Sequence, residues 1–147
     1  MSGLAIHREG ETLLFECGEG TQRQMMRYGV SFALSEIFFT HFHADHFLGV
    51  IGLVRTLGLQ GRPEPLFLYG PKGAKKVLST ALQLGIERAP FPVEIVEVKA
   101  GDIVGGAGGN GKRDGYDICA FPTEHGGGPS VGYVLKDQNR VEKRALR

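Results

Sequence analysis

Residues 40–46 read Thr40-His41-Phe42-His43-Ala44-Asp45-His46. Three imidazoles and a carboxylate therefore fall within six consecutive positions, between the apolar run 37–39 and a second apolar run that starts at Phe47. A fold does not require such a cluster, and its spacing is typical of metal ligands. The alternative is a set of surface or core histidines that bind no metal, a reading that suits a single histidine better than this arrangement.

The expected local structure explains how this stretch would bind a metal. If residues 36–40 form a buried strand and the chain stays extended just beyond it, His41 and His43 project to the same side. Asp45 and His46 then lie where the pattern becomes helical, at a helix N-terminus that favours an anion. Neutral imidazole and carboxylate are ligands expected for zinc, with manganese or iron also possible. Two ligands followed by two more after a turn suggest two adjacent metals.

Length and composition place the chain among ordinary globular proteins. Its 147 residues suffice for one domain or part of one. Seventeen Lys and Arg against sixteen Asp and Glu give a formal net charge of +1, so nucleic-acid binding would need a local basic patch. Two cysteines, no N-terminal signal pattern and no apolar run of about eighteen residues lead us to expect a cytoplasmic protein with no membrane segment.

The remaining pattern predicts strands that alternate with helices in the first two thirds of the chain. We expect strands at residues 4–7, 12–16, 37–40, 66–69, 93–98, 116–122 and 130–135, and helices at 21–29, 47–59 and 74–85. Thr21 is the expected N-cap and Gly29 the expected C-cap of the first helix. The small residues within 16–24 would let the backbone approach a phosphate or the metal loop, or would simply form a tight strand-to-helix turn.

Two other histidines need separate interpretation. His125 lies in the glycine-rich loop 123–129, directly after a predicted strand, where ligand and surface histidine are equally good readings from the residues alone. His7 lies beside no other ligand type and is interpreted as an ordinary polar residue. The glycine run 105–111 is predicted to be a flexible loop, not a phosphate loop. The locally basic segment 136–147 is either a solvated tail or an arm that contacts phosphates.

Two of these stretches together resemble a known family. The H-x-H-x-D-H pattern resembles the metallo-β-lactamase superfamily, and residues 16–24, ECGEGTQRQ, resemble the N-terminal signature of its tRNA 3′-processing endonucleases, the tRNase Z or ribonuclease Z family. That signature commonly begins with Asp, where this chain has Glu16. Segments 68–71 and 122–135 also resemble the family, so the resemblance spans nearly the whole chain.

The resemblance implies both a fold and an activity. The fold would be an α/β (α+β) metallo-β-lactamase-type αββα sandwich, with residues 1–147 forming a single partial domain that represents its N-terminal half to two-thirds. His41, His43 and His125 would bind one zinc, Asp45 and His46 a second, and Asp45 would also accept a proton. The implied reaction is zinc-assisted hydrolysis that removes the 3′ trailer from precursor tRNA, carried out by a homodimer.

The chain also departs from the family pattern. Met1 and Ser2 lead directly into the first hairpin, without the family's first strand, and no residue after His125 can supply its bridging Asp or its last His ligand. We therefore expect a fragment or split subunit whose full activity requires a downstream half. Two alternatives stay open: a phosphodiesterase or thioester hydrolase acting on another substrate, and a non-catalytic half-domain that docks onto a homologous chain.

Overall fold

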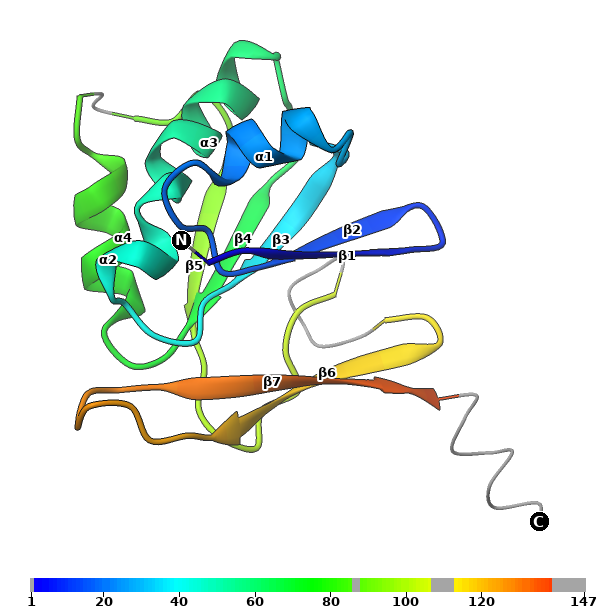
Figure 1. Cartoon of the computed structure of the whole chain (residues 1–147), viewed down its shortest axis with the longest axis vertical. Coiled ribbons are helices and arrows are strands. Elements are labelled where there is room, and N and C mark those ends of the chain that lie inside the picture. The colour runs from blue at the N-terminus through cyan, green and yellow to red at the C-terminus, as the bar shows by residue number, and fades with distance from the viewer. Residues whose placement is uncertain (1, 86–87, 107–112, 139–147) are drawn as a thin grey trace.

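A five-stranded sheet and a two-stranded sheet face each other in the computed structural model, which describes residues 2–85, 88–106 and 113–138 (Figure 1). The first sheet has the order β1-β2-β3-β4-β5, with bounds Leu4–Arg8, Glu11–Phe15, Leu34–Phe38, Leu66–Gly70 and Val93–Glu97. The second pairs β6 (Tyr116–Pro122) antiparallel with β7 (Val131–Asp137). The helices are α1 (Thr21–Arg27), α2 (Ala44–Phe47), α3 (Gly49–Leu59) and α4 (Ala74–Leu82).

The connections in the larger sheet place its helices on one face. Strands β2 to β5 pair in parallel and follow one another in chain order, whereas β1 pairs antiparallel with β2 through a tight turn. Because parallel crossovers are right-handed, a sheet that grows in one direction receives every connecting helix on the same side. Figure 1 shows α1, α3 and α4 together on that side, and β6 and β7 on the other.

Alternate residues of the central strands enter two different cores. Leu14, Ile37 and Leu68 pack under the helices, while their neighbours Leu13, Phe38 and Tyr69 pack against the second sheet. This division follows from the period of two in side-chain direction along a strand. The layers are thus helix, sheet and sheet, which confirms the predicted α/β metallo-β-lactamase-type class and accounts for three layers of its αββα sandwich.

A buried ion pair joins the two sheets. Glu36 on β3 and Arg113 before β6 have side chains 2% and 3% exposed, and the Arg113 guanidinium donates to both Glu36 carboxylate oxygens at 2.7 and 2.6 Å. The same guanidinium lies 3.3 Å from the Tyr116 hydroxyl, which donates to Glu11 on β2. Because both charges are desolvated, this bidentate pair fixes the sheets in one relative position.

Most predicted elements are present, but three boundaries differ. The predicted strand at 37–40 runs instead from Leu34 to Phe38, and the helix predicted at 47–59 is divided into α2 and α3 around Leu48. Thr21 is the first residue of α1 and not its cap, because Gly20 occupies that place with φ 81° and Thr21 Oγ1 donates back to the Gly18 carbonyl. Gly29, predicted as the C-cap, follows Tyr28 in the left-handed conformation.

Two predictions fall largely outside the described residues. The glycine run 105–111 is described only to residue 106, and the basic segment 136–147 only to residue 138. Within the described ranges, none of the helices has the length and apolar character needed to cross a lipid bilayer.

Candidate metal centre

The side chains predicted to bind metal gather where strands β2 and β3 end and where β6 turns into β7. Residues 39–43 connect β3 to α2, and residues 123–130 connect β6 to β7. The two loops are joined by the backbone bond from the Val131 N–H to the Thr40 carbonyl, 2.9 Å long. The site therefore occupies the carboxyl-end edge of the parallel strands, the usual position for function in an open α/β sheet.

Three imidazoles from these two loops face one another. The ring centroids of His41 lie 4.7 Å from those of His43 and 4.1 Å from those of His125, and the His43 and His125 centroids are 4.7 Å apart. His43 Nδ1 and His125 Nε2 approach to 3.0 Å although the residues are 82 positions apart. One ligand nitrogen from each of the three lies within 4.8 Å of the others, which is the spacing of donors around one ion.

The buried imidazole of His41 provides a test of whether a metal fits. Its Nδ1 lies 2.8 Å from Thr40 Oγ1, while its buried Nε2 has no hydrogen-bond partner among the described residues. Burial, followed by the neighbouring imidazoles of His46, His125 and His43, lowers the pKa of His41 to about 4. The ring is therefore neutral at physiological pH with a lone pair on one nitrogen. A metal ion would satisfy this otherwise costly buried atom, so the residues fit the metal.

The structure places the other two predicted ligands side by side at the start of α2. Asp45 Oδ2 lies 3.4 Å from His46 Nε2, and the Asp45 side chain is 59% exposed. His46 Nδ1 is turned the other way, 2.8 Å from Glu16 Oε2. Asp45 and His46 thus offer one oxygen and one nitrogen to a common point, but Asp45 belongs to neither group of three potential donors that the described residues form.

Glu16 is a site residue that the sequence interpretation did not select. With His41 and His46 it forms the second group whose potential donor atoms lie within 4.8 Å of one another. The available signal was its place at the start of the segment 16–24, where the family resemblance expects a carboxylate. Its distance of thirty positions from His46 hid the contact.

The glycine-rich segment after Glu16 lies directly against the metal loop. The Cys17 N–H donates to the His46 carbonyl at 2.8 Å, and the Gly49 N–H donates to the Cys17 carbonyl at 2.9 Å. A Cβ on Gly18 would lie 2.2 Å from the Asp45 carbonyl oxygen. Of the three interpretations of these small residues, close approach to the metal loop is therefore the one that the contacts support.

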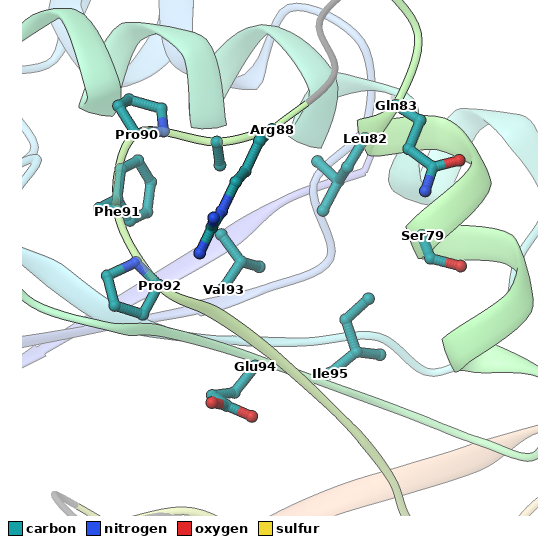
Figure 2. Close-up of a pocket in the computed structure, with 11 residues that line it drawn as sticks. Ser79, Leu82, Gln83, Arg88, Pro90, Phe91, Pro92, Val93, Glu94 and Ile95 are labelled. Carbon is teal, nitrogen blue, oxygen red and sulfur yellow. The ribbon is translucent and has the colours of Figure 1, made fainter.

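Two hollows and one histidine complete the search for alternative sites. A hollow of about 330 Å³ borders the three imidazoles and is also lined by Phe42, Lys72, Val77 and Pro129. A second hollow, of about 720 Å³, lies between α4 and the start of β5, away from the histidines; Figure 2 shows its Pro90–Pro92 wall opposite Ser79 and Gln83. His7 Nδ1 lies 3.1 Å from Thr12 Oγ1 within the first hairpin, far from both donor groups, as its interpretation as an ordinary polar residue implies.

Known proteins share both this sequence and this fold. The family model described as Anti-Pycsar protein Apyc1 matches residues 2–138. A ribonuclease Z from Gemmatimonas aurantiaca is 53% identical over 141 residues, which are 95% of this chain and 43% of that protein, so the chain spans less than half of its length. The crystal structure of the short form of human tRNase Z superposes with a TM-score of 0.77 at 30% identity, covering 93% of this chain and 58% of that one. The metallo-β-lactamase-fold protein YhfI from Bacillus subtilis shares the fold with a TM-score of 0.69 at 15% identity, covering 92% of this chain and 51% of that one.

Proposed function

This chain belongs to the family described as Anti-Pycsar protein Apyc1, within the metallo-β-lactamase fold, and we propose that it forms the metal-binding part of a zinc-dependent endoribonuclease that removes the 3′ trailer from precursor tRNA. The observation that carries the proposal is the convergence of His41, His43 and His125 from loops far apart in the sequence. The relatives named ribonuclease Z and tRNase Z supply the substrate class.

In this proposal each side chain has one role. His41, His43 and His125 hold one zinc, and Asp45 and His46 hold the second. Bound zinc would supply Lewis acidity and a lowered pKa for water, the chemistry that phosphodiester hydrolysis needs. The exposed Asp45 carboxylate, beside His46 Nε2, would accept a proton at the reacting centre.

The hollow beside the three imidazoles provides space for the nucleotide next to the scissile bond. Its wall combines the apolar side chains Phe42, Val77 and Pro129 with one cation, Lys72. We infer that Lys72 contacts the phosphate backbone, since ammonium groups bind phosphates as point charges.

The assembly and location are also part of the proposal. Residues 1–147 would act as one partial domain within a cytoplasmic homodimer. Two cysteines without a disulfide, Cys17 and Cys119, suit a reducing compartment. The mass of the purified protein in solution, measured by light scattering, tests the dimer.

A chimera tests the function directly. The segment of the Gemmatimonas aurantiaca relative that lies beyond its match would be appended after residue 138, and the chimera and the chain alone would be incubated with end-labelled precursor tRNA and zinc. We expect the chimera to release the trailer and leave a 3′-hydroxyl, and the chain alone to turn over far more slowly because it offers three donors to one metal and two to the other. Ordinary enzyme rates from the chain alone would refute this dependence on the downstream half.

A small phosphodiester is the second candidate substrate, because the matching family model is described by an anti-Pycsar protein and not by a tRNA-processing enzyme. Parallel assays on precursor tRNA and bis(p-nitrophenyl) phosphate separate the two. Hydrolysis of the small diester, without trailer release or salt-sensitive tRNA binding, would replace the tRNA proposal. In both assays, Asp45→Ala in the chimera serves as the inactive reference.

A further inference from the structure

The backbone at the end of β2 has an unusual conformation. Glu16 has φ 64°, in the left-handed region that non-glycine residues rarely adopt. Its N–H donates to the Phe38 carbonyl at 2.8 Å, and the neighbouring Cys17 N–H donates to the His46 carbonyl. This conformation turns the Glu16 side chain from the sheet toward the metal loop, where it is 12% exposed. A local backbone strain of roughly 1–3 kcal/mol persists only where the surroundings impose it.

Both oxygens of the Glu16 carboxylate are engaged by that loop. Oε1 accepts the Thr40 N–H at 2.6 Å, and Oε2 lies 2.8 Å from His46 Nδ1. Thr40 in turn places its Oγ1 2.8 Å from His41 Nδ1. One carboxylate therefore touches the loop at two points and reaches, directly or through Thr40, two of the proposed metal ligands.

These contacts decide which nitrogen of His46 carries the proton. An ionised carboxylate only accepts hydrogen bonds, so His46 Nδ1 must donate to Oε2. The lone pair of a neutral His46 is then on Nε2, the atom that lies 3.4 Å from Asp45 Oδ2. A carboxylate that receives the second ring N–H of a ligand histidine fixes both its tautomer and its orientation.

We propose that Glu16 is a positioning residue of the metal centre, which holds His46 as the Nδ1–H tautomer and fixes the start of the metal loop through the Thr40 N–H. This inference rests on the metal site proposed above. Direct metal ligation by Glu16 is the competing role, since its carboxylate lies within reach of His41 and His46. The positioning role accounts better for the contacts, because each oxygen already accepts a proton donor.

The first test requires neither metal nor RNA. Long-range ¹H–¹⁵N spectra of the metal-free chain, at about pH 8 where a free histidine is neutral, report the tautomer of each imidazole. We expect Nδ1–H for His46 in the wild type. Glu16→Gln keeps the size of the side chain but offers an NH₂ group that can donate to Nδ1, so the Nε2–H form should become populated. Glu19→Gln, at an exposed carboxylate three residues away, is the matched control and should change nothing. Nδ1 without a proton in the wild type would overturn the proposal.

The second test measures metal affinity by competition with a chromophoric chelator. We expect Glu16→Gln to weaken zinc binding about 10- to 100-fold, as is typical when an outer partner of a ligand histidine is lost. Glu16→Asp, which is one methylene shorter, should weaken zinc binding less. Unchanged affinity in Glu16→Gln would refute the positioning role, whereas a wild-type chain that binds no zinc would refute the proposed metal centre itself.

Discussion

At the scale of single residues, His125 matters most because it is the member of the imidazole cluster that comes from the second sheet. It is exposed and lies in a loop, so its removal should leave the fold intact. We expect His125→Ala to weaken zinc binding by more than the roughly 100-fold that loss of an outer partner costs. Isothermal titration measures this effect.

His7→Ala is the matched control, since His7 contacts Thr12 in a hairpin remote from the cluster. Equal zinc affinity in His125→Ala and His7→Ala would contradict the assignment of His125 as a ligand.

The residues themselves also mark the limit of sequence interpretation at this site. The pattern of residues 41–46 predicts donors that do lie close together, because a strand end and a helix start place them there by local geometry. His125 was undecided from the residues alone, and Glu16 was not selected at all. Both reach the cluster through sheet pairing and loop contacts over 30 to 82 positions, which no local spacing encodes.

At the scale of elements, local propensity predicted most strands and helices but not the break between α2 and α3. The apolar spacing continues through Leu48, so the pattern alone indicates one helix. The Cys17 carbonyl, however, accepts the Gly49 N–H and the Cys17 N–H donates to the His46 carbonyl, so β2 and the metal loop determine where the helix restarts. The same tertiary contacts place Thr21 inside α1, with Gly20 ahead of it in a conformation that suits glycine.

Two glycines in α3 allow a matched comparison of this contact. A Cβ on Gly49 would lie 2.0 Å from the Gly18 carbonyl oxygen, whereas one on Gly52 would meet only the flexible Gln22 side chain, at 3.2 Å. We expect Gly49→Ala to lower the free energy of unfolding by about 3 kcal/mol through backbone displacement. Gly52→Ala should change it by less than about 1 kcal/mol, because helix propensity then favours alanine.

Urea unfolding measures both variants, and zinc affinity should fall in Gly49→Ala alone. Similar unfolding midpoints for the two variants would show that α3 does not press against the segment 16–18.

At the scale of the whole molecule, the junction between the sheets should make stability depend on alkaline pH. Burial and the hydrogen bond to Glu11 raise the pKa of Tyr116 to about 12. A raised folded-state pKa contributes stability that is complete below the ordinary tyrosine pKa, near 10, and is lost as the pH rises through the folded value. We therefore expect the free energy of unfolding to fall between about pH 10 and 12.

Tyr116→Phe should reduce that slope and cost about 1 kcal/mol at neutral pH through the lost hydrogen bond. Tyr28→Phe, at an exposed position on the helical side, is the control and should keep the wild-type slope. Burial also raises the pKa of Tyr69 and Tyr133, so the slope should shrink without vanishing. An identical slope in Tyr116→Phe and wild type would contradict the assignment.

The metal centre also connects the two layers of the sandwich, because His41 and His43 follow a strand of the first sheet and His125 belongs to the hairpin of the second. An ion bound only in the folded state stabilises it by about 2.7 kcal/mol when its free concentration is 100 times its dissociation constant. For a chain of this length each kcal/mol raises the unfolding temperature by about 2–4 °C. We therefore expect zinc to raise the midpoint of thermal unfolding by about 5–10 °C. Magnesium should have little effect, because it prefers oxygen ligands. Equal shifts with zinc in wild type and His125→Ala would show that the ion does not bridge the sheets.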